Sequence, residues 1–271
     1  MRRAVFTYLA LGVAAVLILA PYLMSVQTSL KTPRQFAQRP PLAPPSPATG
    51  ANYAELLVGG HSLIPPLVIT VQVVLVVVIG QLTSSVLAAY AFARLDFPGR
   101  DAIFRVYLAT LMVPPVAVLV PRFVLLGAAG LADTFWGIVL PSMFGSPYAI
   151  FLLRQFFRAL PRELLDAARL DGAGHLRVLR HVVLPLSRPI LATLLIITVV
   201  THWNDFLWPL VVTSGVRWQV LTVAVAALQS QYNGDWTLVM AATTLATLPL
   251  LVLFVIFQKH LVRSITVTGM R

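Results

Sequence analysis

The chain has 271 residues and a formal net charge of +11, yet only 11% of its residues are charged and 58% are hydrophobic. A soluble domain of this length carries about a quarter charged residues, so this composition excludes a water-soluble globular protein. The apolar runs are continuous and lack the alternation over roughly 10 residues of a membrane β-barrel, and they predict an all-α membrane protein.

Six transmembrane helices are predicted along the chain. The first covers about residues 5–26 behind two arginines, and its ~22 residues at ~1.5 Å each cross a hydrocarbon core of ~30 Å. No A-x-A cleavage site follows it, so we interpret it as an uncleaved span rather than a signal peptide. The other five spans are predicted at about residues 67–92, 103–126, 135–156, 190–212 and 238–257.

Several of these spans contain proline. The third contains Pro114 and Pro115, and the fourth, fifth and sixth also carry prolines. Lipid tolerates them only where neighbouring helices or water satisfy the freed backbone groups, so they indicate a packed bundle.

A proline-rich external segment separates the first helix from the other five. We therefore predict two parts. Residues 1–61 form the first helix and its external loop, and residues 62–271 form a five-helix transport core with a cytoplasmic segment at about residues 158–188.

The basic residues are distributed asymmetrically. If the amino terminus is cytoplasmic, only five of the 20 lysines and arginines fall outside or near the outer face, and the other 15 are cytoplasmic. This bias predicts that both termini are cytoplasmic. It also accounts for the net charge without a nucleic-acid partner, since some of these residues contact anionic lipid. The five outer residues are Lys31, Arg34, Arg39, Arg122 and Arg217.

The longest cytoplasmic connection covers residues 154–188. Pro161 is placed to start a helix, with Glu163 in its first turn, and the sequence DGAG then ends it. A second helix is predicted at about residues 175–184, stopped by Pro185. From these features alone the segment is either an amphipathic pair on the bilayer surface or a docking element for a cytoplasmic partner.

This connection resembles the EAA motif of ABC importer permeases, whose pattern is E-A-A, three residues, G, nine residues, I-x-L-P. The chain has Asp166-Ala167-Ala168, then Gly172, then Val182, Leu184 and Pro185, with the same spacing throughout. Asp replaces Glu and Val replaces Ile. The stretch WNDFLWPLVV at 203–212 and the ending FQKHLVRSITVTGMR resemble the carbohydrate branch, in particular the smaller permease of maltose-type importers.

The resemblance implies a type I ABC importer permease fold in a bacterial or archaeal cytoplasmic membrane. It implies a second homologous permease, an ATPase dimer and an extracytoplasmic binding protein that delivers a sugar. Such a permease is not an enzyme and binds no cofactor, since ATP and Mg²⁺ are bound by the ATPase. The sequence agrees, because neither of its two lysines, Lys31 and Lys259, lies in a phosphate-binding G-x-x-x-x-G-K-[ST] loop.

The resemblance also assigns site residues. Gly172 is expected to allow a tight turn against the ATPase, and Asp166 to offer a carboxylate to the partner or to pair with Arg169 three residues on. The full set expected to couple to the ATPase is Glu163, Asp166, Ala167, Ala168, Asp171, Gly172, Ala173, Leu184 and Pro185.

Asp205 is an ionisable residue within the fifth span, which marks a candidate functional site. Trp203, Asn204, Asp205 and Trp208 have side chains suited to sugar recognition, and we predict that they line the substrate path. The alternatives are that this helix end lies at the membrane interface, or that the partner permease supplies the substrate contacts.

Other classes of protein fit less well. An intramembrane enzyme would need a third partner for His202 and Asp205, and no such residue or metal-ligating set is visible. A secondary transporter or channel would not need the EAA-like segment, and no internal repeat is found. The main alternative is an ABC importer permease for a non-sugar solute such as glycerol-phosphate, a polyamine or a peptide.

Overall fold

The computed structural model describes residues 2–231 and 235–268, and every regular element within these ranges is a helix. Four helices are long and apolar enough to cross a membrane: Val5–Ser29, Ile64–Arg94, Phe135–Ala159 and Trp236–Gln258. Two bent pairs raise the number to as many as six, namely Arg100–Met112 with Pro115–Ala128 and His175–Leu186 with Arg188–Trp203. The all-α prediction is confirmed, and six spans are reached when each bent pair counts as one.

The chain divides into two compact units. The first contains Met1–Ile69 and Gln219–Leu251, and the second contains Thr70–Trp218 and Val252–Arg271. These units are defined by the contacts within each of them, which do not show which residues transport the solute. The predicted division into residues 1–61 and 62–271 therefore stays a prediction.

The first unit contains α1 (Arg2–Ser29), α2 (Pro33–Gln38), α3 (Ala51–Val58), α14 (Leu221–Gln231) and the first part of α15 (Trp236–Thr268). Polar contacts tie its helices together. The Asn52 side chain donates to the Ser29 and Lys31 carbonyls at 2.7 and 2.9 Å. The Ser25 hydroxyl donates to the Met240 carbonyl at 3.3 Å. Helix α14 was not predicted, because its 11 residues are too few to span a membrane.

The second unit is built along α4 (Ile64–Arg94), which packs against the junction of α7 (Phe135–Met143) and α8 (Pro147–Ala159). At Gly80 a β-carbon would lie 2.6 Å from the Met143 carbonyl oxygen, so only glycine allows this approach. Nearby, the Ser85 hydroxyl accepts a hydrogen bond from the Ser146 amide at 3.2 Å. The fourth predicted span is thus two helices, and α4 satisfies part of the backbone at their junction.

The third predicted span, at about residues 103–126, is formed by a bent pair of helices. The chain forms α5 (Arg100–Ala109), two short 3₁₀ turns, η1 (Thr110–Met112) and η2 (Pro115–Val118), and then α6 (Leu119–Ala128). The two halves meet at 98°. Pro114 and Pro115 cause the break, because proline lacks an N–H and drives the residue before it out of the helical region. Val113 and Pro114 are accordingly extended, with ψ of 118° and 133°.

The fifth span is also interrupted, since α12 (Arg188–Trp203) and α13 (Leu207–Val212) are separated by residues 204–206. Before it, α10 (His175–Val178) continues through the π-helical turn η3 (Leu179–Val183) into α11 (Leu184–Leu186). The prediction that Pro185 stops this helix is therefore wrong. Pro185 lies just after the π-helical turn, and the continuous helix ends one residue later at Leu186. The Ser187 amide and hydroxyl both donate to the Val183 carbonyl, at 3.0 and 2.6 Å.

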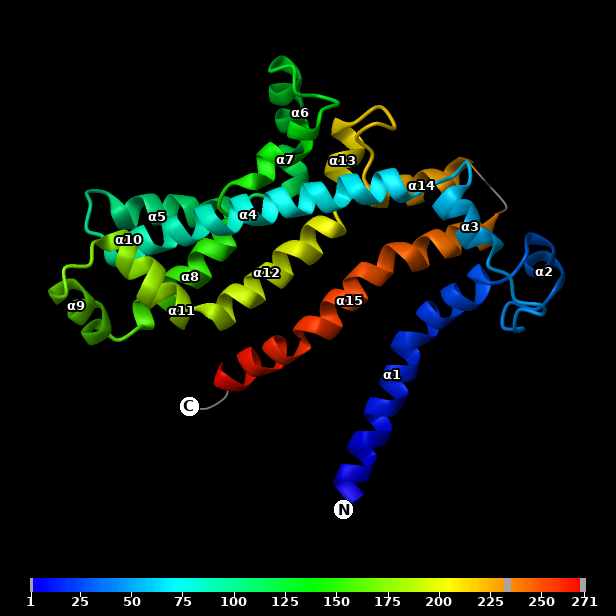
Figure 1. Cartoon of the computed structure of the whole chain (residues 1–271), viewed down its shortest axis with the longest axis horizontal. Helices are drawn as coiled ribbons and strands as arrows, with labels where there is room; N and C mark the ends of the chain where they lie inside the picture. Colours follow the sequence, from blue (N-terminus) through cyan, green and yellow to red (C-terminus); the bar gives the residue numbers. More distant parts are fainter. Residues whose placement is uncertain (1, 232–234, 269–271) are drawn as a thin grey trace. The chain divides into compact units, whose positions relative to one another are not determined.

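The core of the second unit joins the membrane helices to the predicted cytoplasmic segment. Tyr90 of α4, Phe104 of α5 and Phe157 of α8 pack in one buried cluster with Leu165 of α9 (Arg162–Leu170). Residues of α10, η3 and α12 complete the cluster. Figure 1 shows α9 and α10 at the end of α4 where α8 also ends.

Candidate functional site

Helix α9 is amphipathic. Leu165 is only 3% exposed and inserts into the core described above, whereas Leu164 and Leu170 are 47% and 90% exposed. Glu163 lies in the first turn, where a carboxylate interacts favourably with the helix dipole. One face of α9 is therefore anchored to the bundle, and the opposite face is free.

The turn after α9 depends on Gly172. Its φ of +78° is a left-handed conformation that side chains rarely adopt. The Gly172 amide donates to the Arg169 carbonyl at 2.9 Å, and the Ala173 amide donates to the Ala168 carbonyl at 3.0 Å. This pair of bonds forms a Schellman motif, which satisfies carbonyls at the end of the helix. Nothing lies within 4 Å of the position of a Gly172 β-carbon, so the backbone conformation, not crowding, selects glycine.

The second helix holds the turn in place from the other side. Val178 and Val183 are buried, while Leu176 is 74% exposed. Leu170 and Leu176 thus place apolar side chains on either side of the exposed turn. The exposure of both leucines was not predicted from the sequence. The spacing of apolar residues along a helix does not show which of them pack against another part of the chain.

Seven of the predicted coupling residues lie in α9 and its turn, and the other two, Leu184 and Pro185, lie in α11. Asp166 and Arg169 lie 3.6 Å apart, three residues apart on α9, and both are largely exposed, so the pair adds little stability. The exposed members of the set are Glu163, Asp166, Ala167, Asp171, Gly172 and Pro185, and the partly buried members are Ala168, Ala173 and Leu184.

Arginines fasten this segment to the ends of the membrane helices. Arg94, the last residue of α4, donates to the carbonyls of Phe157 and Leu160, the latter at 2.8 Å. These carbonyls lie at the carboxyl end of α8, where that of Phe157 accepts only a long bond from the Leu160 amide, at 3.4 Å, besides the one from Arg94. Arg94 therefore joins α4 to the point where the chain leaves α8 for α9.

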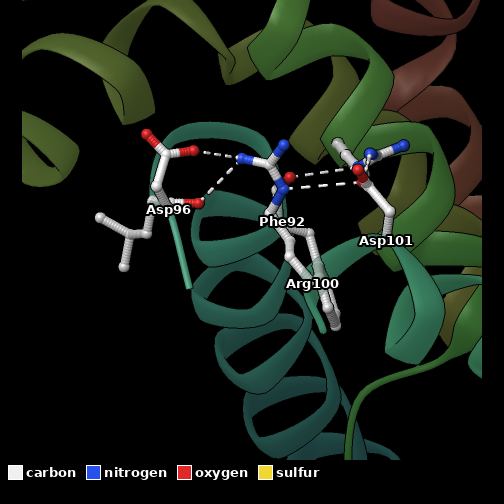
Figure 2. A network of polar contacts seen from close by, with 6 residues as sticks. Phe92, Asp96, Arg100 and Asp101 are labelled. Carbon is white, nitrogen blue, oxygen red and sulfur yellow. Dashed lines mark hydrogen bonds and ion pairs between the residues drawn. The ribbon is translucent and has the colours of Figure 1, made fainter. Parts of the chain in front are cut away.

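A second set of contacts connects α4, α5 and α8. Figure 2 shows Arg100 between Asp96 and Asp101, at 2.7 and 3.6 Å. Arg154, whose side chain is 8% exposed, donates to Asp101 at 3.0 Å and to the Phe92 carbonyl at 3.2 Å. Its guanidinium also lies 4.0 Å from the centre of the Phe104 ring. This network holds three helix ends at fixed positions beside α9.

The predicted substrate-path residues lie at the break between α12 and α13. Trp203 and Trp208 are 7% and 4% exposed. The indole N–H of Trp208 donates to the carbonyls of Gly137 and Ile138 at 3.3 and 3.2 Å. The Asn204 side chain donates to the Val200 carbonyl at 2.8 Å and so caps α12. Both tryptophans thus contribute to packing, and Asp205 follows directly after the cap.

Arg122 of α6 adds a charge that sequence reasoning had counted only as an external one. Its guanidinium lies 4.0 Å from the centre of the Trp208 ring, and it donates to the Ser142 hydroxyl at 3.4 Å. Asp205 and His202 both interact electrostatically with Arg122. The signal in the sequence was an arginine toward the outer end of a predicted apolar span.

These features define an integral membrane protein with several spans and a helix–turn–helix projection at the end of its bundle. The projection carries no catalytic constellation, and no group of three or more His, Asp or Glu able to hold a metal occurs in the described parts of the chain.

Residues 81–267 match the family model for the binding-protein-dependent transport system inner membrane component. The chain therefore belongs to this family. It is a multi-pass inner-membrane permease of a transport system that works with a solute-binding protein, and it is not an enzyme.

Relatives with assigned transport systems extend over most of the chain. The sn-glycerol-3-phosphate transport system permease protein UgpE of Yersinia pestis bv. Antiqua is 35% identical over 272 residues, covering 96% of this chain and 95% of that protein. The arabinooligosaccharides transport system permease protein AraQ of Halalkalibacterium halodurans is 34% identical over 202 residues, covering 74% and 72%.

Solved structures have the same fold. One chain of a bacterial ABC transporter involved in the import of the acidic polysaccharide alginate superposes with a TM-score of 0.84 at 22% identity, covering 94% of this chain and 95% of that one. A second structure, of the alginate transporter in complex with a periplasmic protein that holds an alginate pentasaccharide, gives a TM-score of 0.67 at 17% identity, covering 97% and 95%. The ABC transporter permease fold predicted from the sequence is confirmed.

Proposed function

We propose that the chain is the permease subunit of an ATP-driven importer for a sugar or sugar derivative, and that α9, its turn and α10 couple it to a separate ATPase. The observation that carries the proposal is the exposed Schellman turn at Gly172, with Leu170 and Leu176 exposed beside it. Apolar side chains that project from a charged segment are typical of helix-in-groove contact with a partner.

The attachment of α9 supports a coupling role. Leu165 fixes the inner face of α9 in the core, and Arg94 joins α4 to the chain that leads into α9. A displacement of α9 by an ATPase would therefore be transmitted to α4 and α8 rather than absorbed by a loose loop.

The proposed assembly contains a second homologous permease and an ATPase dimer. Val106 of α5 and Met112 of η1 are 70% and 85% exposed, and Val120 and Leu125 of α6 are 66% and 71% exposed. These apolar surfaces are suited to contact with another permease and with lipid. Within this assembly ATP and Mg²⁺ are bound by the ATPase, and this chain binds no cofactor.

The proposed orientation places both termini and the α9–α10 segment in the cytoplasm. It is supported by the predicted distribution of basic residues, 15 of which lie on that side. The proline-rich segment that contains α2 then lies outside, on the side of the solute-binding protein.

The substrate proposal is a sugar, with glycerol-phosphate as the alternative, because the relatives named above include transporters of both kinds. We propose that Trp203, Asn204, Asp205 and Trp208 form or support part of the path. Arg122 and Asp205 together supply hydrogen-bond donors and acceptors for a polar solute within the membrane helices. Screening the cognate binding protein against sugars and glycerol-phosphate distinguishes the two substrates.

The experiment that tests the coupling proposal is the Leu170→Asp variant, expressed with its native transport genes. We expect normal amounts of the variant in the membrane, with loss of solute uptake and of ATPase co-purification, because a charge replaces an apolar contact. Val216→Asp is the matched control, since Val216 is 83% exposed but lies outside the α9–α10 segment. Retention of the ATPase and of uptake by Leu170→Asp would contradict the proposal.

A further inference from the structure

The second unit contains a cavity of about 450 Å³ between the ends of α4 and α8 and the inner side of α9. Two carboxylates, Asp96 and Asp166, line it, together with the apolar residues Phe92, Ala93 and Leu165. Six arginines also line it: Arg94, Arg100, Arg154, Arg158, Arg162 and Arg169.

The two carboxylates already have partners. Asp96 accepts from Arg100 at 2.7 Å, and Asp166 lies 3.6 Å from Arg169. Within the described part of the chain, the side chains of Arg158 and Arg162 make no hydrogen bond or ion pair. Asp101, which does not line the cavity, pairs with Arg154 and Arg100 at 3.0 and 3.6 Å. Six guanidinium groups therefore face three carboxylates, and the chain leaves an excess of positive charge in the cavity.

The arginines also act on one another. Arg94 interacts electrostatically with Arg162 and Arg169, and Arg154 interacts with Arg158 and Arg100. The Nε of Arg94 is buried without a hydrogen-bond acceptor. Like charges held this close are stabilised when an anion with several acceptor oxygens lies between them, and the planar fork of arginine fits phosphate oxygens well.

We propose that this cavity binds the phosphate group of an anionic phospholipid. Its walls include the ends of α4 and α8, which belong to two helices able to cross the membrane, so the arginines lie where phospholipid headgroups are found. The wall of the cavity is mostly polar, with a small apolar part from the partly buried Phe92 and Ala93, so the cavity takes the phosphate group and leaves the acyl chains outside. Arg158 and Arg162 are exposed, so a headgroup reaches them from the bilayer.

The bound lipid neutralises the cavity and attaches the base of α9 to the membrane surface. This inference concerns a site separate from the solute path and from the exposed turn at Gly172, and it holds for any imported solute.

The test uses the full chain, purified in mild detergent with the subunits that accompany it, and native mass spectrometry at low salt. Phosphatidylglycerol and phosphatidylcholine are added in parallel. We expect the parent protein to retain phosphatidylglycerol preferentially, and the Arg158→Gln/Arg162→Gln double variant to bind it on the order of tenfold more weakly. Phosphatidylcholine binding should not change. The control is Arg105→Gln/Arg180→Gln, because both arginines are exposed and neither lines the cavity.

Three outcomes would overturn the proposal. The first is equal phosphatidylglycerol binding by the cavity variant and the parent. The second is displacement of the lipid by millimolar inorganic phosphate alone, which would identify a soluble phosphate as the ligand. The third is loss of the ATPase from the cavity variant with lipid binding unchanged, which would make the arginines an ATPase contact. If the double variant does not purify, Arg162→Gln alone is measured, with a smaller loss of phosphatidylglycerol expected.

Discussion

At the scale of single residues, Gly172 and Gly130 form a natural comparison. Both have positive φ, +78° and +68°, and neither has any atom within 4 Å of the position of a β-carbon. They differ in location, since Gly172 ends α9 whereas Gly130 lies between α6 and α7. A side chain added at either position has a similar conformational cost, because both backbones are left-handed. A difference in function between the two variants would therefore be due to where the glycine lies in the structure.

We predict that Gly172→Asp abolishes uptake while the protein still inserts into the membrane. Aspartate tolerates the left-handed conformation at a cost of about 1 kcal/mol, so the turn persists, but its side chain projects from the docking surface. Uptake and ATPase co-purification measure the effect, and Gly130→Asp should retain both. Equal behaviour of the two variants would show that the turn at Gly172 has no special role.

The glycines of the sequence DGAG located the turn after α9, because a left-handed turn favours glycine. The coupling role of Asp166, Gly172 and Pro185 came from their resemblance to the EAA motif, and it stays a prediction. The exposure of Leu170 and the position of Arg122 over Trp208 were not predictable, because they depend on which side of each helix finds a neighbour. Periodicity gives the apolar face of a helix but not the contacts made by that face.

At the scale of elements, the junction of α4, α5 and α8 depends on Arg154. Its side chain is 8% exposed and satisfies the Phe92 carbonyl, the Asp101 carboxylate and the face of the Phe104 ring. The ion pair with Asp101 is weakened by solvent, since the Asp101 side chain is 62% exposed. The carbonyl bond and the ring contact therefore provide most of the stabilisation.

We predict that Arg154→Gln lowers the stability of the purified protein by about 1–3 kcal/mol, because a partly buried carbonyl loses its donor. Thermal unfolding in detergent measures the change. Arg105→Gln, at an exposed position of α5, should change stability by no more than about 0.5 kcal/mol. A melting temperature of Arg154→Gln equal to that of the parent protein would contradict this account of the junction.

The elements themselves were predicted unevenly. Hydropathy located α1, α4 and α15, because a long uninterrupted apolar helix has a distinctive composition. Pro114 and Pro115 indicated a packed bundle, but the prediction did not extend to the 98° bend that they cause. The break between α12 and α13 falls at Asn204 and Asp205, which favour turns, and Pro209 has no N–H to donate to the Asp205 carbonyl four residues before it. The local sequence therefore marked a break that the prediction of one span did not include.

At the scale of the whole molecule, the proposed orientation has a direct test. The chain contains no cysteine, so single cysteines can be introduced without removing others. In intact spheroplasts, a membrane-impermeant thiol reagent should label Val58→Cys and Val216→Cys, which are 87% and 83% exposed and are placed outside. Leu170→Cys should be labelled only after the membrane is broken. The reverse pattern would overturn the orientation.

The function proposed for this permease depends on the docking of the turn after α9 on a separate ATPase. The most direct measurement is cross-linking from Leu170→Cys, at a position that is 90% exposed, using a thiol-directed photoreactive reagent in native membranes. The account predicts one major product that joins the chain to an ATPase, with no such product from Val216→Cys. Cross-links from Leu170→Cys to lipid alone, in membranes that contain the assembled transporter, would contradict it.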